Sequence, residues 1–259
     1  TGLAACPTDQ YSGRHKTNKL ECYSMLKIAE DVLLPRGWYV PIEANSGSVL
    51  KELLSVARVP IIFPPDIPTP AMQQSIIAES GETHLSMADK ILDAMGDWRL
   101  RLDGYGSIYI EPIPTDLAST FDANSNDIIE TDISVTYDWY SAPNVLRCTL
   151  DDSSAEARDE DDDSPLSIQN RGREVWLEDT DVTLCSDETL AEYAIRMLKY
   201  YQRTATTISY NRRYEPDVYP GDLVRINYPA QEISGRFYIT DQSITLGYNA
   251  KTSEEVIKV

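Results

Sequence analysis

Hydrophobic positions in the first part of the chain recur at helical spacing in three places. Apolar residues three or four apart predict a helix over residues 22–33, ended by Pro35. The same spacing predicts two more helices, over residues 48–57 and 85–95. Five prolines in residues 60–70 predict an extended, turn-rich segment between these two helices. The first part of the chain therefore reads as mixed, with helices dominating.

Further along, hydrophobic and polar residues alternate instead, as they do in strands with one buried face. A first hairpin is predicted around the turn Asp103-Gly104. Two prolines and a polar run in residues 112–127 then give the best domain boundary. Beyond it, strands are predicted at residues 133–139, 145–150, 174–177, 204–212, 223–226, 236–239, 244–248 and 255–259.

One more helix precedes the last strands, and two glycine turns separate them. Ser186 or Asp187 can cap a helix over about residues 187–203. We expect its apolar side to pack on the strands that follow. Gly221 and Gly235 are predicted at turn positions that suit a residue without a Cβ.

The pattern as a whole predicts an α+β protein with two domains. Residues 1–115 would form a helix-rich mixed domain with a hairpin. Residues 116–259 would form a small antiparallel β-barrel domain with one packed helix.

The order of these motifs resembles the tail-hub (baseplate hub) proteins of long-tailed bacteriophages. In that family a helix leads into a small β-barrel with the pattern seen here as PGDLVRI followed by GRFYITDQSITLG. Residues 86–111 resemble the family's helix and hairpin, 133–147 its next strand pair, and 21–54 its two preceding helices. The family usually has a further barrel ahead of this region, where only residues 1–20 stand here. We expect that barrel to be absent or to lie outside this chain.

The resemblance implies a structural protein of the virion, made in the bacterial host cytoplasm. It implies three copies around the tail axis, joining the tail tube to the tail tip. The implied partners are a distal tail protein, the tape measure, and a tip or receptor-binding protein, with DNA present only in transit. Hubs of contractile injection machines share the architecture, so a prophage-derived or secretion-related particle stays open.

The net charge of −19 argues against two classes of partner, nucleic acids and anionic membranes. Binding to nucleic acid or to an anionic membrane needs clustered Lys and Arg. Solubility is the preferred explanation of the charge, and the resemblance implies an alternative, an acidic channel that repels passing DNA. No apolar run is long enough for a membrane helix, so no membrane anchor is expected.

Catalytic and metal-binding patterns are missing, which predicts a protein that is not an enzyme and has no cofactor. There are two histidines, and no nucleophile elbow, zinc motif or phosphate loop. The four cysteines are scattered, which argues against zinc and against a disulfide framework. Residues 151–163, with eight acids, are expected to be a solvated loop dispensable for folding, with calcium binding as the alternative. Asp122, Asn124 and Asn126 have calcium-loop spacing, but a linker is the preferred interpretation.

Aromatic residues are biased toward amphipathic rings, with 16 Tyr and four Trp against three Phe. Such rings suit protein interfaces and sugar-stacking surfaces. The interface candidates are Tyr137, Trp139, Tyr140, Tyr214 and Tyr219. The alternative functions are a carbohydrate-binding adhesion module of a tail tip and a tail-associated peptidoglycan-degrading enzyme.

Overall fold

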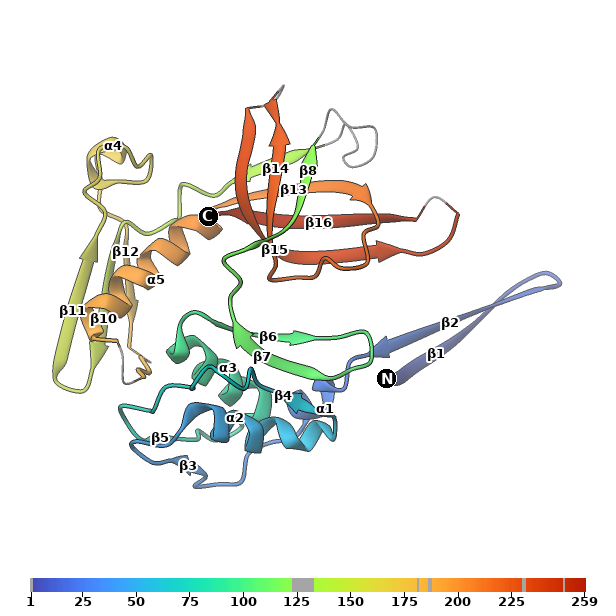
Figure 1. Cartoon of the computed structure of the whole chain (residues 1–259), viewed down its shortest axis with the longest axis horizontal. Coiled ribbons are helices and arrows are strands. Elements are labelled where there is room, and N and C mark those ends of the chain that lie inside the picture. The colour runs from blue at the N-terminus through green and yellow to red at the C-terminus, as the bar shows by residue number, and fades with distance from the viewer. Residues whose placement is uncertain (1, 123–132, 181, 186–187, 230–231, 249) are drawn as a thin grey trace. The chain divides into compact units, whose positions relative to one another are not determined.

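The computed structural model describes all residues except 1, 123–132, 181, 186–187, 230–231 and 249. Contacts divide the chain into two units (Figure 1). Unit 1 comprises Thr1–Pro112 and Thr183–Glu188, and unit 2 comprises Ile113–Val182 and Thr189–Val259. The sequence did not predict that residues 183–188 would belong to unit 1. The division at residues 115 and 116 stays a prediction, because grouping by contacts does not test independent folding.

Unit 1 has a helical core, and its helices begin at polar caps. They are α1 (Leu26–Asp31), α2 (Ser46–Leu54), η1 (Ser55–Ala57) and α3 (His84–Met95). The Asn45 side chain accepts a hydrogen bond from the Ser48 amide, and Thr83 and Ser86 form a capping box. The apolar faces meet in a core that includes Leu50, Leu53, Leu54, Met87, Ala88, Ile91, Ile108 and Ile110. Among the described residues, no helix is both long and apolar enough to cross a membrane.

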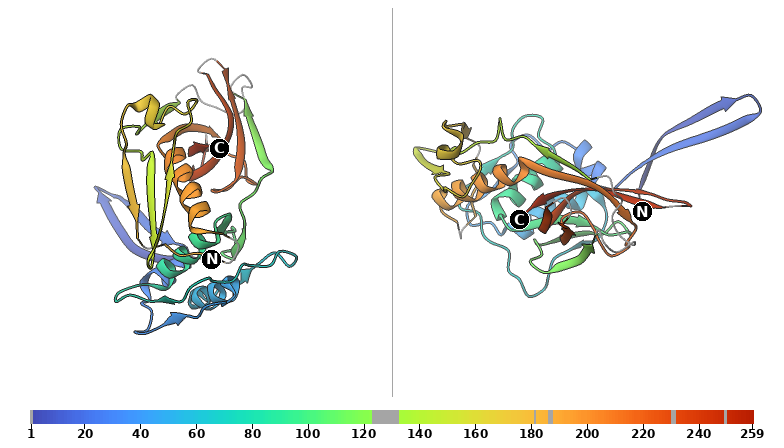
Figure 2. Two further views of the ribbon diagram at one scale, coloured as in Figure 1. Left: turned by 90° about the vertical axis from the view of Figure 1, so that its left-hand side faces the viewer. Right: turned by 90° about the horizontal axis from the view of Figure 1, so that it is seen from above.

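The strands of unit 1 form small sheets. They are β1 (Leu3–Ser12), β2 (His15–Tyr23), β3 (Tyr39–Val40), β4 (Ile61–Ile62), β5 (Ile76–Ile77), β6 (Trp98–Leu102) and β7 (Ile108–Pro112). The hairpin predicted at Asp103-Gly104 is confirmed as β6–β7. The helix predicted over residues 22–33 is shorter, because residues up to Tyr23 pair with β1 in a hairpin that extends away from α1–α3 (Figures 1 and 2).

Unit 2 contains a six-stranded sheet that buries one face. Its strands are β8 (Leu117–Asp122), β9 (Ser134–Tyr137), β13 (Thr206–Arg213), β14 (Leu223–Tyr228), β15 (Ile233–Thr245) and β16 (Lys251–Lys258), in the order β8-β14-β15-β16-β13-β9. The expected antiparallel barrel is corrected in two respects. Closure needs the outermost strands to pair, and β8 and β9 do not pair within the described residues. β8 also runs parallel to β14.

A second sheet in unit 2 carries the long helix. It consists of β10 (Val145–Leu150), β11 (Ser153–Arg158) and β12 (Trp176–Asp179), with the short helix α4 (Ile168–Arg171) nearby in sequence. Helix α5 (Leu190–Thr204), capped by Thr189 and Glu192, lies along β10 and β11 (Figure 2). The expectation that this helix packs mainly on the barrel strands was therefore wrong. Its buried side chains are Tyr193, Ala194 and Leu198, whereas Met197 is half-buried.

The acidic segment 151–163 is not the loop expected from its charge. Residues 153–158 form β11, whose Ala157 is buried under α5. The Asp159 carboxylate is almost buried and accepts hydrogen bonds from Ser164 Oγ at 2.6 Å and Gln202 Nε2 at 2.8 Å. Alternation around Ala155 and Ala157 was the signal for this strand, and the density of acids concealed it.

The two glycines predicted at turns occupy different environments. Gly221, two residues before β14 begins, has φ of 85°, a conformation that favours glycine. Gly235 lies inside β15 opposite Ile226, so the turn predicted at Ser234-Gly235 was wrong. The chain reverses earlier, because β14 ends at Tyr228 and pairs there with Ile233.

The core of the six-stranded sheet contains a buried ion pair. Apolar residues from every strand surround it, including Phe121, Ile208, Val224, Ile226, Phe237, Ile239 and Val256. The Arg212 and Glu254 side chains are fully buried, with Arg212 NH2 2.6 Å from Glu254 Oε1 and Nε 2.8 Å from Oε2. Tyr210 Oη donates to Glu254 at 2.6 Å, Gln242 donates at 2.8 Å, and the guanidinium lies over the Phe121 ring. Each carboxylate oxygen therefore accepts two hydrogen bonds.

Candidate functional site

Two of the five interface candidates lie together at a groove in unit 2. Tyr137 ends β9, and Trp139 follows it. Their rings meet edge to face with centroids 4.9 Å apart. Trp139 Nε1 donates to Thr206 Oγ1 at 2.9 Å, and the Asp138 amide donates to the Ala205 carbonyl at 2.8 Å. These bonds fix the Trp139 ring and the backbone beside it, and the Tyr137 ring packs against Trp139.

The groove has a volume of about 630 Å³, and we call it the aromatic groove. Its apolar lining includes Val135, Ile208, Ile233 and Phe237 beside the two aromatic rings. Tyr137 is 59% exposed and Trp139 41%, so both rings offer surface to a partner. A concave apolar surface with fixed aromatic side chains is typical of a binding site.

The rim of the aromatic groove is positively charged. Three cations line it, Lys199 and Arg203 near the end of α5 and Lys258 at the end of β16. Glu232 is the single acid among the described lining residues. None of these three cations forms an ion pair with any residue that the structure describes. Lys199 also borders a neighbouring hollow lined by Asp159, Glu160 and Asp161.

The other three candidates lie outside the aromatic groove. Tyr140 is 80% exposed, and the Arg173 guanidinium lies 4.4 Å from its ring centroid. Tyr214, just beyond β13, is half exposed. Tyr219 is half-buried, and its amide donates to the Asp222 carboxylate. The structure thus brings Tyr137 and Trp139 together and leaves the others apart from that groove.

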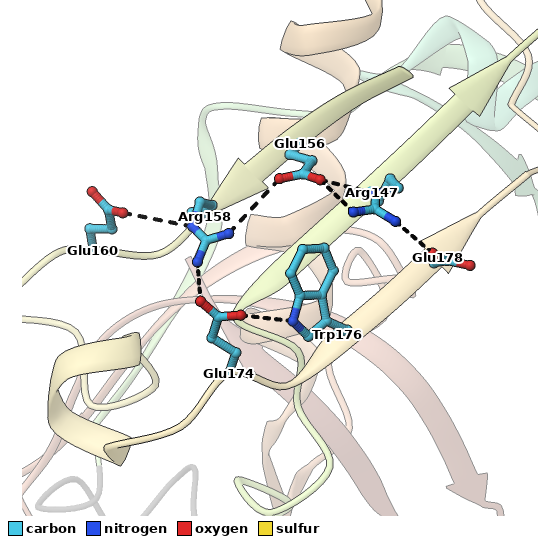
Figure 3. A network of polar contacts seen from close by, with 7 residues as sticks. All are labelled: Arg147, Glu156, Arg158, Glu160, Glu174, Trp176 and Glu178. Atoms are coloured by element: carbon cyan, nitrogen blue, oxygen red, sulfur yellow. Dashed lines mark hydrogen bonds and ion pairs between the residues drawn. The ribbon is translucent and has the colours of Figure 1, made fainter. Parts of the chain in front are cut away.

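The three-stranded sheet presents a second surface of note, a network of charged side chains (Figure 3). Arg147 bonds Glu156 with distances of 2.7 and 3.0 Å and Glu178 at 3.1 Å. Arg158 pairs with Glu174, which also accepts a hydrogen bond from Trp176 Nε1 at 2.9 Å. Both guanidinium groups lie over the Trp176 ring, at 4.9 and 5.7 Å from its centroid. We call this set the ion-pair face.

Its charges satisfy one another, which limits what the ion-pair face can bind. The hydrogen bonds with Glu156, above all, raise the pKa of Arg147, so this side chain stays charged. Since the cations already have carboxylate partners, a ligand would have to displace them. The ion-pair face is thus better suited to hold three strands in register than to recognise an anion.

Candidate metal-ligating side chains do not converge among the described residues, and one buried cysteine is a poor nucleophile. Across the part of the chain that the structure describes, no group of three or more His, Cys, Asp or Glu side chains could hold a metal ion. The candidate calcium spacing at Asn124 and Asn126 lies outside the described residues. Burial raises the pKa of the Cys148 thiol to about 11, which makes it a poor nucleophile near neutral pH.

Sequence reasoning missed the charged rim of the aromatic groove and the buried ion pair. Lys199 is exposed on α5, but the fold alone brings it to the same groove as Lys258. Arg212 was detectable, because alternation places it on the same strand face as Ile208 and Tyr210. An arginine on an apolar strand face signals a buried partner.

Comparison with protein-family models gave no match to this chain, and comparison with curated proteins gave none either. Solved structures do match. A tail protein from Neisseria meningitidis aligns over 99% of this chain and 79% of its own length, with a TM-score of 0.76 and 13% identity. The 43 kDa tail protein of prophage MuSo2 from Shewanella oneidensis aligns over 98% of this chain and 78% of its own, with a TM-score of 0.71 and 12% identity.

A third match comes from a prophage of a different bacterium. A prophage tail protein from Listeria monocytogenes aligns over 100% of this chain and 76% of its own length, with a TM-score of 0.53 and 12% identity. At these identities the likeness concerns the fold. The fold is that of phage tail and baseplate-type proteins, which confirms the resemblance predicted from the sequence at that level.

Proposed function

We propose that the chain is a structural component of a phage tail or a tail-derived particle, part of the hub that links the tail tube to the tail tip. The observation that carries the proposal is the length of the match. A tail protein shares the fold over 99% of this chain, through both units and the segments between them. A small sheet or a helix pair recurs in unrelated proteins, whereas this order of elements over the whole chain is far more restrictive.

Three features of the chain fit an assembly role. Unit 2 has exposed Tyr and Trp rings, and protein interfaces in general are rich in these residues. The solved structures that share its fold are tail proteins by name, in keeping with a protein that is not an enzyme. The net charge of −19 suits the wall of a channel through which DNA passes without binding.

The finer assignment follows the family that the sequence resembles. Three copies would surround the tail axis and contact a distal tail protein, the tape measure, and a tip or receptor-binding protein. The interface candidates Tyr137, Trp139, Tyr140, Tyr214 and Tyr219 would lie at contacts with these neighbours. The protein would reside in the virion after synthesis in the bacterial host cytoplasm.

A carbohydrate-binding adhesion module is the second candidate, and the aromatic groove is the observation that favours it. Exposed rings in contact, such as Trp139 and Tyr137, can stack on sugar faces. Its lining includes four neutral polar side chains, but each already makes a hydrogen bond within the protein: Ser164, Gln202, Thr206 and Ser234.

The two candidates differ in what the purified chain does. Mass photometry followed by cryo-electron microscopy should show closed three-fold rings if the hub assignment holds. A chain that stays monomeric at micromolar concentration and binds cell-wall glycans on an array would overturn the hub assignment in favour of adhesion. Hydrolysis of peptidoglycan, abolished by one point substitution, would overturn both in favour of a lysin.

A further inference from the structure

The cations of the aromatic groove gather on a chain that is acidic as a whole. The chain has 42 acidic and 23 basic residues, and yet three basic side chains and one acid are among the described residues that line this groove. Arg147, Arg158 and Arg212 each pair with a glutamate. Arg203 and Lys258, by contrast, line the same groove and pair with no described residue. The groove is thus a positively charged site on an acidic protein.

Its lining combines this charge with an apolar floor. Phe237 and Ile208 are almost wholly buried at the bottom, and the Trp139 ring stands fixed at the side. A ligand that fills such a site must carry apolar groups for the floor and negative charge for the rim. Trp, Tyr and Arg are also the residues that contribute most binding energy in protein interfaces.

We propose that the aromatic groove binds an acidic, amphipathic peptide segment of a partner protein. Its apolar or aromatic side chains would sit against Trp139 and Phe237. Its carboxylates would face Arg203, Lys258 and Lys199. The proposal does not depend on the tail assignment, because it follows from the lining of the groove alone.

Charge complementarity favours a peptide over a neutral glycan. A sugar without acidic groups would leave Arg203 and Lys258 partly desolvated and without partners, which weakens binding. A basic peptide would be repelled by the rim. The volume of about 630 Å³ accommodates a few side chains rather than a folded domain.

The test uses the full chain and three synthetic peptides of equal length. One alternates Glu with Leu and Phe, and the other two carry Gln or Lys in place of every Glu. Isothermal titration calorimetry should detect binding of the Glu peptide, weakened by added salt, with the Gln peptide about tenfold weaker and the Lys peptide inactive.

Matched variants separate the groove from general charge and from unfolding. Arg203→Gln with Lys258→Gln should weaken the Glu peptide about tenfold or more, and Trp139→Ala should do the same. Arg225→Gln with Arg236→Gln changes net charge equally, on exposed residues outside the groove, and should leave binding unchanged. Trp176→Ala is the control for Trp139→Ala, since the two rings are 42% and 41% exposed.

Several outcomes overturn the proposal. Equal binding of the Glu and Gln peptides would show that charge does not determine affinity. An equal loss of affinity in the groove variants and their controls would show that the peptide does not bind in the groove. No binding of the Glu peptide at millimolar concentration, together with binding of an acidic oligosaccharide, would assign the groove to glycans instead. Loss of the three-fold ring would refute the hub assignment and leave the peptide result standing.

Discussion

Removing the buried Arg212 should lower the stability of unit 2 more than removing an arginine from an exposed ion pair. Arg212→Met deletes the guanidinium that makes two hydrogen bonds to Glu254 and leaves that carboxylate buried with Tyr210 and Gln242. Breaking a buried pair by removing one partner costs about 3–5 kcal/mol. The expected loss in the free energy of unfolding is therefore about 3–5 kcal/mol.

An exposed pair of the same chemistry provides the matched control. Arg147 and Glu156 also make two close N–O contacts, at 2.7 and 3.0 Å, but their side chains are 41% and 38% exposed. Exposed ion pairs contribute about 0–1 kcal/mol. Arg147→Met should thus cost no more than about 1 kcal/mol.

Urea denaturation, followed by far-ultraviolet circular dichroism, measures both variants under the same conditions. Tyr210→Phe adds an intermediate case, because it removes one hydrogen bond to a charged group, with an expected cost of about 1.5–3 kcal/mol. The reasoning fails if Arg212→Met and Arg147→Met lower the unfolding midpoint equally with unchanged slope. It also fails if Arg212→Met with Glu254→Leu is less stable than Arg212→Met alone, since the double change removes the stranded charge.

Other predictions concern the remaining parts of unit 2. Leu198→Ala should cost about 2–5 kcal/mol and Lys199→Ala close to nothing, measured by the same urea titration, and equal costs would contradict the orientation of α5. Burial, together with a nearby carboxylate, raises the pKa of Cys148 from 9.0 to about 11. As the pH rises, the thiol therefore loses its proton at a lower pH in the unfolded state than in the folded state. Stability should therefore fall between pH 9 and 11 more in the parent than in Cys148→Ala, and parallel pH profiles would contradict this. Replacing residues 151–163 by a Gly/Ser turn should abolish cooperative unfolding of unit 2, because β11 is lost; unchanged thermal stability would support the loop interpretation instead.

Local sequence patterns predicted where helices and strands lie better than they predicted which elements pack together. Helical spacing predicted a helix over residues 85–95, and α3 spans His84–Met95. The spacing of apolar residues shows which side of a helix is buried but not which sheet it packs on. The prediction therefore placed α5 on the wrong sheet. Its apolar residues Tyr193 and Leu198 would have fitted either sheet.

Charge density misled the interpretation where alternation was the better guide. Residues 151–163 contain eight acids, and yet β11 forms there because β10 and α5 bury Ala157. Tertiary contacts overrode the repulsion between exposed carboxylates, some of which pair with Arg147 and Arg158. The candidate rings Tyr137 and Trp139 were found from composition alone, whereas the cations beside them depend on three elements meeting in space.

Immunogold electron microscopy of intact particles tests the central claim most directly. Antibodies raised against the purified chain would be applied to particles isolated from the source that encodes it. The account predicts gold at one end of the tail, where the tube meets the tip, with three copies per particle by quantitative mass spectrometry. Particles with complete tails that neither bind the antibody nor contain peptides of this chain would contradict it.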